Sequence, residues 1–144
     1  MITLKTSFEC ETAHRLFNVA TYSEECRDNI HGHSYKYTVE VARKDGSLND
    51  ANMICDFKLL KETIKEFEKK YDHSVIIKKD DPLCEPLLKH CKKVNVVEEN
   101  PTAEWMVQKF PKELNFLFEM KGLGIEVVSL EIAETTGNMA VWRK

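Results

Sequence analysis

The chain lacks the features that would divide it, anchor it in a membrane or join it by disulfide bonds. None of its apolar runs approaches the roughly 18 residues of a membrane-spanning helix. No repeat, low-complexity tract or Pro/Gly-rich linker interrupts the 144 residues, and the N-terminus shows no secretory signal. The five cysteines are odd in number and lack CxxC spacing, which favours free thiols in a reducing compartment. These absences predict one cytoplasmic domain spanning residues 1–144 and no membrane partner.

The chain also lacks a strong charge of either sign. Its formal net charge of −3 provides no general attraction for nucleic acid, so no nucleic-acid partner is expected. An anionic substrate would therefore need a local basic pocket. Hydrophobic residues at 42% and charged residues at 31% are typical of a globular domain with a real core.

Alternation of apolar and polar residues predicts two strands near each end of the chain. The predicted strands are 2–8, 35–41, 125–133 and 139–143. Residues from about 17 to 30 have no periodicity and are expected to form a loop. The strands flank two helices, so the pattern predicts an α+β fold: a four-stranded antiparallel sheet with the two helices packed on one face.

The first predicted helix follows the N-cap Asp56, because apolar residues recur every three or four positions as far as Tyr71. The second begins at Thr102, and Pro111 is expected to kink or interrupt it. Gly122 and Gly124 are expected to end it. The segment 80–99 between the helices is mixed, with room for a short helix and a strand at 94–97.

The chemistry of the chain is suggested first by His31-Gly32-His33 at the start of an alternating segment. Side chains two apart on a strand share a face, about 6.6 Å apart along the strand. A strand pairing beside it would bring His14 to the same place. Three histidines with a fourth position open are typical of catalytic zinc sites. Taken alone, however, a His-x-His pair on a strand is more often a half-exposed polar pair.

The sequence around these histidines resembles the 6-pyruvoyltetrahydropterin synthase family. The two most specific blocks are Ala13-His14-Arg15-Leu16 and the segment from Cys26 to Tyr35, which contains His-Gly-His. Three further blocks follow in the family's order: Tyr71-Asp72-His73, Asn100-Pro101-Thr102-Ala103-Glu104 and Glu134-Thr135-Thr136. Within the family, the chain looks most like the bacterial branch that makes 6-carboxytetrahydropterin for queuosine (7-deazaguanine) biosynthesis.

The resemblance implies a tunnelling fold, whose subunits join sheets into a trimeric barrel, with two trimers forming a homohexamer. It also implies a zinc-dependent lyase that converts 7,8-dihydroneopterin triphosphate to 6-carboxytetrahydropterin, releasing acetaldehyde and triphosphate. The metal ligands would be His14, His31 and His33. The implied catalytic set is Cys26, Asp72 and His73, with Glu134 binding the pterin ring. Thr102 and Thr135 are candidates for further hydrogen bonds to the substrate. Arg15, Arg27 and the lysines are all candidates for binding the triphosphate, and the sequence does not choose among them.

Other interpretations stay open at this point. The same fold and zinc site could stop at 6-pyruvoyltetrahydropterin, or serve a folate-pathway enzyme in which Glu25 replaces Cys26 as the base. The chain could also be a zinc-stabilised binding module without catalysis. Each residue has an ordinary structural alternative as well: Cys26 as a loop thiol, Asp72-His73 as a helix C-terminal cap, Thr102 as an N-cap.

Overall fold

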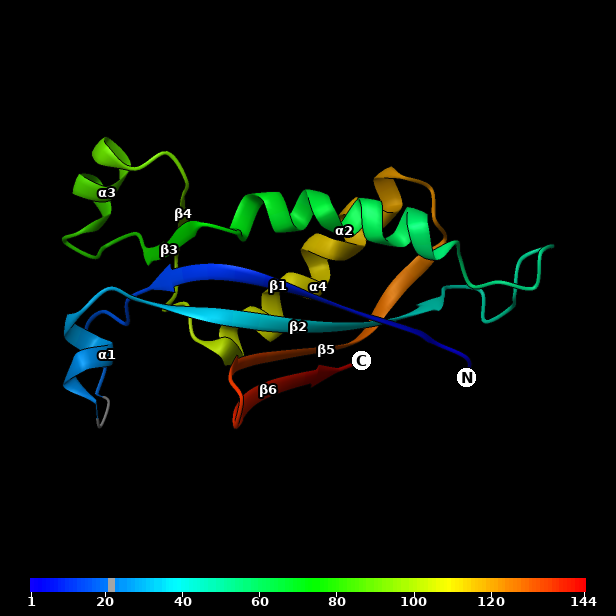
Figure 1. The fold of residues 1–144 in the computed structure, drawn as a ribbon, viewed down its shortest axis with the longest axis horizontal. Coiled ribbons are helices and arrows are strands. Elements are labelled where there is room, and N and C mark those ends of the chain that lie inside the picture. The colour runs from blue at the N-terminus through cyan, green and yellow to red at the C-terminus, as the bar shows by residue number, and fades with distance from the viewer. Residues whose placement is uncertain (21–22) are drawn as a thin grey trace.

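Within the residues that the structure describes, 1–20 and 23–144, the fold is a six-stranded mixed sheet accompanied by four helices (Figure 1). This computed structural model contains the strands β1 (Leu4–His14), β2 (His31–Arg43), β3 (Ser74–Lys78), β4 (Val94–Val97), β5 (Ile125–Thr135) and β6 (Asn138–Arg143). The helices are α1 (Glu24–Asp28), α2 (Phe57–Tyr71), α3 (Cys84–His90) and α4 (Ala103–Met120). The predicted α+β class is therefore confirmed.

The predicted four-stranded antiparallel sheet is wrong in the number and direction of its strands. The sheet order is β4-β3-β1-β2-β5-β6, in which β1, β2, β5 and β6 form the expected antiparallel part. β3 adds to β1 in parallel, and β4 adds to β3 in parallel. Burial does not alternate along the five residues of β3, because the neighbours Ile76 and Ile77 are both buried. A short apolar run of this kind fits a strand and a helical segment equally well.

The two long helices confirm the predicted boundaries. The Asp56 carboxylate accepts hydrogen bonds from the amides of Lys58 and Leu59 at the start of α2. Thr102 caps α4 through the amide of Trp105, and Pro111 lies buried inside α4 without interrupting it. α4 ends at Met120, followed by Gly122 in the left-handed region at φ 64°. The predicted loop at 17–30 contains the short helix α1, and its residues 21 and 22 lie outside the described residues.

Alternation along β1 and β2 separates a core face from an outer face. Tyr35 and Tyr37 of β2 are fully buried against the helices, whereas Ser34 and Lys36 beside them are exposed. α2 and α4 cover the core face, and Phe67 and Phe110 from these helices pack edge to face within the core. No helix in the described ranges combines the length and apolar character needed to cross a membrane.

Candidate metal centre and active site

The pairing of β1 with β2 brings the three histidines together. β1 is longer than predicted and ends at His14, which lies directly opposite His31 in the antiparallel register. His33 follows on the same face of β2, opposite Thr12. One ring nitrogen from each of the three residues lies within 4.8 Å of the other two. These side chains form a group that can hold a metal ion, at the end of the sheet where α1 joins β1 to β2 (Figure 1).

Backbone carbonyls orient two of the rings. His14 Nδ1 lies 2.7 Å from the carbonyl of Pro101, and His31 Nδ1 lies 3.1 Å from the carbonyl of Asn29. Since a carbonyl oxygen only accepts hydrogen bonds, each neutral ring carries its proton on Nδ1 and a lone pair on Nε2. The two Nε2 atoms nevertheless lie 3.0 Å apart. Two lone pairs so close repel each other unless a positive centre lies between them.

This donor set fits zinc. Ligand nitrogens at 2.0–2.1 Å from a tetrahedral ion lie about 3.4 Å from one another, close to the observed separation of His14 and His31. His33 Nε2 is buried and makes no hydrogen bond in the described part of the chain. Burial lowers the pKa of both His14 and His33, an effect that the neighbouring rings reinforce. Low pKa values keep the imidazoles neutral, as metal ligands must be.

Glu134 and Tyr35 lie against this group. Glu134, near the end of β5, places its Oε1 atom 3.5 Å from His33 Nε2. The Tyr35 hydroxyl donates to Glu134 Oε2 at 3.4 Å and contacts His14 Nδ1 at 3.3 Å. Burial, and next the charge of Glu134, raise the pKa of Tyr35 well above its usual range. Tyr35 therefore remains a neutral hydroxyl between the histidines and the carboxylate.

Asp72 and His73 form a second, separate constellation beside β1. Asp72 Oδ1 accepts a hydrogen bond from the amide of Glu11 at 2.8 Å, and Asp72 Oδ2 lies 2.9 Å from His73 Nδ1. The Glu11 amide and next His73 lower the pKa of Asp72. Because the carboxylate accepts, His73 carries its proton on Nδ1 and presents Nε2 as a base.

His73 has an unusual backbone conformation. Its φ of 58° lies in the left-handed region, which a residue with a Cβ rarely adopts. The amide of His73 donates to the carbonyl of Glu11 at 2.7 Å and holds the residue in place beside β1. Asp72 is also the C-cap of α2, so the structural role expected for this position is present together with the paired geometry.

Cys26 lies in α1 and is half-buried, whereas the neighbouring Glu25 is exposed and accepts a hydrogen bond from the Ser23 hydroxyl. Its helix lies between β1, which ends at His14, and β2, which begins at His31. Within the described residues, the side chains of Asp72 and His73 hydrogen-bond to the Glu11 amide and to each other, and the backbone of the pair bonds to Glu11, Glu68 and Lys93. None of them reaches Cys26.

Two cavities adjoin the histidine group. A cavity of about 760 Å³ is lined by Glu134 and Thr135 together with Gly32-His33-Ser34. A smaller one of about 330 Å³ is lined by His73 and the same Gly32-His33-Ser34 segment. Thr135 is thus exposed beside Glu134, whereas the Thr102 hydroxyl is engaged as the cap of α4.

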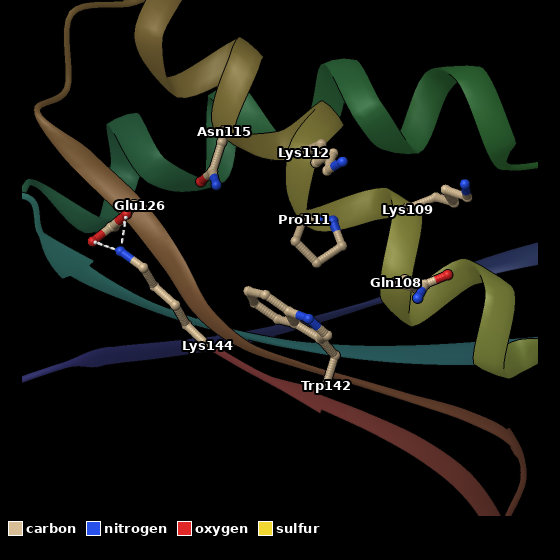
Figure 2. A pocket seen from close by; sticks show the side chains of 8 residues that line it. All are labelled: Gln108, Lys109, Pro111, Lys112, Asn115, Glu126, Trp142 and Lys144. Carbon is tan, nitrogen blue, oxygen red and sulfur yellow. Dashed lines mark hydrogen bonds and ion pairs between the residues drawn. The ribbon is translucent and has the colours of Figure 1, made fainter.

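A third cavity, of about 480 Å³, lies between α4 and the β5–β6 hairpin and is separate from this site. In Figure 2 the Trp142 side chain lies below Pro111, and Lys144 binds Glu126. None of the residues lining this cavity is a predicted site residue. The two arginines proposed for the triphosphate are engaged elsewhere: Arg15 pairs with Asp81, and Arg27 pairs with Asp28.

The protein has an α+β fold, three converging histidines and a carboxylate beside a cavity. These features define a class of proteins that can bind a metal and a polar ligand together. Residues 2–144 match the 6-pyruvoyl tetrahydropterin synthase family, and the chain belongs to that family. A 6-carboxy-5,6,7,8-tetrahydropterin synthase from Aquifex aeolicus is 33% identical over 81% of this chain and 75% of its own. One from Rickettsia felis is 28% identical over 94% of this chain and 95% of its own. These relatives place the chain with the bacterial 6-carboxytetrahydropterin synthase branch.

Solved structures share the fold. An uncharacterized protein from Wolinella succinogenes superposes with a TM-score of 0.77 at 21% identity, covering 99% of this chain and 98% of that one. The 6-pyruvoyl tetrahydropterin synthase of Caenorhabditis elegans superposes with a TM-score of 0.67 at 18% identity, covering 99% of this chain and 95% of that one. At these identities the likeness concerns the fold alone.

Three contributors to the site were not predicted from the sequence. Tyr35 follows His33 by two positions, so the same alternation that pairs the histidines also places its hydroxyl on their face. The carbonyls of Pro101 and Asn29 orient His14 and His31. A backbone carbonyl leaves no signal in side-chain identity, so only the fold reveals these two contacts.

Proposed function

We propose that this protein is a zinc-dependent lyase that converts 7,8-dihydroneopterin triphosphate to 6-carboxy-5,6,7,8-tetrahydropterin, in queuosine (7-deazaguanine) biosynthesis. The other products are acetaldehyde and triphosphate, and the atoms balance when one water is consumed. The names of the sequence relatives support this choice of reaction. A pterin-processing role accords with membership of the family.

The observation that carries the proposal is the juxtaposition of Glu134 with the histidine group. A metal site alone would suit a structural role, but here a half-buried carboxylate lies 3.5 Å from His33 and faces a cavity of about 760 Å³. A carboxylate can accept two parallel N–H bonds from the pyrimidine part of a pterin. Glu134 therefore binds and orients the ring so that the substrate side chain points toward the histidines. Thr135, beside it, offers a hydroxyl to the same ligand.

His14, His31 and His33 hold the ion, and the carbonyl partners of His14 and His31 fix the orientations of those two rings. Zinc, when bound there, acts as a Lewis acid toward the side-chain oxygens of the substrate. The group comprises three protein ligands, the number typical of catalytic zinc sites, and would leave a position for substrate or water.

Cys26 and the Asp72–His73 pair move protons. The Cys26 thiolate takes a carbon-bound proton from the substrate side chain. His73, with its Nδ1 proton held by Asp72, accepts and returns protons at the side-chain oxygens through Nε2. Thr102, which caps α4, contributes by fixing the helix start beside Pro101, whose carbonyl orients His14.

The active assembly in this proposal is a homohexamer of two trimers whose sheets join edge to edge. Two free edges in the described chain support it: β6 is the last strand on one side, and β1 pairs with β3 only at Thr12–His14 on the other. The segment of β1 from Leu4 to Cys10 therefore has unsatisfied backbone groups available to a neighbour. Light scattering coupled to size-exclusion chromatography would measure the oligomer directly.

Product analysis tests the function. The zinc-loaded protein is incubated with 7,8-dihydroneopterin triphosphate, and the pterin is identified by mass spectrometry while acetaldehyde is trapped and quantified. We expect 6-carboxytetrahydropterin and acetaldehyde in equal amounts. Formation of 6-pyruvoyltetrahydropterin without acetaldehyde would assign the elimination reaction instead. Tight zinc binding with no turnover of any pterin triphosphate would support a binding module.

A further inference from the structure

The short helix α1, which carries Cys26, is attached to the molecule in an unusual way. None of its residues is buried, so apolar packing contributes little to its position. Two of its backbone carbonyls are instead held from the segment that follows β1. The amide of Leu16 donates to the carbonyl of Cys26 at 3.3 Å, and Arg15 Nε donates to the carbonyl of Arg27 at 3.2 Å.

Arg15 is in turn held by a buried carboxylate from another part of the chain. Its Nη1 atom lies 3.0 Å from Asp81 Oδ1, and the Asp81 side chain is 0% exposed. The same Asp81 oxygen accepts the amide of Leu83 at 2.9 Å, which fixes the carboxylate in the turn before α3. The guanidinium also lies over the Phe17 ring, with Cζ 5.7 Å from the ring centroid. Arg15 therefore has one orientation, set by these neighbours and the α1 carbonyl.

A buried ion pair of this kind contributes little net stability, because desolvation offsets most of the attraction. Asp81 Oδ2 is moreover buried without a partner in the described residues, which adds to the cost. What the pair does supply is geometry: the planar guanidinium can direct Nη1 to Asp81 and Nε to the α1 carbonyl at once. A lysine ammonium is a point charge on a flexible side chain, so it does not fix two hydrogen bonds in set directions.

From these contacts we infer that Arg15 and Asp81 are positioning residues for Cys26. Asp81 orients Arg15, Arg15 holds the Arg27 carbonyl, and α1, which carries Cys26, is thereby fixed between the strand ends that carry His14 and His31. Because both side chains are engaged within the chain, the role assigned to them is positioning and not contact with the substrate. The inference rests on the proposed function for its kinetic consequence, but the position of the thiol is measurable without turnover.

The experiment compares Asp81→Asn with the wild type in a Cys91→Ser background, because Cys91 is exposed whereas Cys10, Cys55 and Cys84 are buried. The substituted side chain still accepts the Leu83 amide through its carbonyl oxygen, but it lacks the charge that holds Arg15. Asp45→Asn is the matched control, since it removes the carboxylate of an exposed Arg43–Asp45 pair that has no contact with α1. The readouts are the rate of Cys26 alkylation by iodoacetamide, followed by peptide mass spectrometry, together with zinc content, kcat and KM.

We expect faster alkylation of Cys26 in Asp81→Asn, because a released α1 exposes its half-buried thiol, with zinc content unchanged. Turnover should fall at the same time: a misplaced catalytic group lowers kcat on the order of 10- to 100-fold, with little change in KM. A lost or less reactive thiolate would slow both alkylation and turnover, so the opposite directions identify positioning. Asp45→Asn should match the wild type.

Arg15→Lys provides the second test and covers the case in which Asp81→Asn does not fold. It keeps the positive charge beside Asp81 but loses the planar guanidinium that bonds Asp81 and the α1 carbonyl together. Alkylation of Cys26 should therefore rise again and kcat should fall. Unchanged alkylation of Cys26 in a folded variant would overturn the inference, whatever the activity. If alkylation rises but Cys26→Ala retains full turnover, the positioning is upheld and the proposed role of Cys26 as the base is refuted.

Discussion

His33 Nε2 and Glu134 Oε1 lie 3.5 Å apart, so the end of β5 brings a carboxylate against a ring of the candidate metal centre. β2 and β5 pair as far as Lys36 and Ala133, and Glu134 follows directly after this last β5 residue that pairs with β2. Under the proposed function, this contact joins the metal-binding and ring-binding parts of one site. We therefore expect the two binding events to be separable by substitution.

Substituting any of His14, His31 or His33 by Ala should remove the metal and the activity together. Each ring supplies one of three ligands, and losing one leaves too few donors to hold zinc tightly. Zinc content by elemental analysis and turnover are the measurements, with the exposed His90→Ala as control. A wild type that binds no stoichiometric metal, and whose turnover withstands chelators, would contradict the metal assignment.

Glu134→Gln should weaken pterin binding while leaving zinc content unchanged. Glutamine replaces one acceptor oxygen with a donor that would face a ring N–H. The loss of one charge-assisted hydrogen bond costs about 1.5–3 kcal/mol, or about 10- to 150-fold in Kd. Titration with a non-reactive pterin measures this effect. Glu131→Gln, which lines the same cavity, is the control. Equal affinity in wild type and Glu134→Gln would remove Glu134 from the pterin site.

Cys26→Ala should keep zinc and bind the pterin but lose most of its turnover. General base catalysis contributes on the order of 10²–10⁴-fold, and the thiol is not among the metal ligands. Single-turnover kinetics would separate this loss from slower product release, and Cys91→Ala controls for a missing thiol. Near-normal turnover here, with a loss in Glu25→Ala, would transfer the role of the base to the glutamate.

Asp72→Asn should destabilise the fold at neutral pH and do so less in acid. The pKa of Asp72 is lowered in the folded state, so its carboxylate stabilises the protein above the pKa of the unfolded chain. This stabilisation is lost as the pH falls through the lower, folded pKa. Urea midpoints at pH 7 and near pH 3 should therefore differ more between wild type and variant at pH 7. A constant difference would contradict this linkage, and Asp80→Asn is the control for an exposed carboxylate.

Much of this arrangement could be predicted because the signals are local. Alternation along 35–41 predicts β2 and its core face, and the Asp56 and Thr102 caps mark both long helices at the correct residues. The convergence of His14 with His31 and His33 needed only one further assumption, that the first two strands pair. The antiparallel register then sets His14 opposite His31.

Other features depend on contacts between distant parts of the chain. The parallel addition of β3 to β1 is set by where α2 ends, and five residues without alternation give no signal of it. From the sequence, Arg15 is a candidate for binding the triphosphate, because no nearby residue in the sequence reveals that Asp81 is its partner. The position of Asp72 is likewise fixed by the Glu11 amide of β1, which carries no residue-specific signal.

Gly32 lies between the two histidines of β2 and lines both adjoining cavities, as His33 and Ser34 do. A Cβ at Gly32 would lie 3.5 Å from the Thr12 carbonyl, an ordinary contact, so the backbone itself accepts alanine. Packing around the backbone therefore does not require glycine here, and the missing side chain leaves open space in the wall that the two cavities share. A larger side chain at this position would take up volume along that shared wall, in both cavities at once.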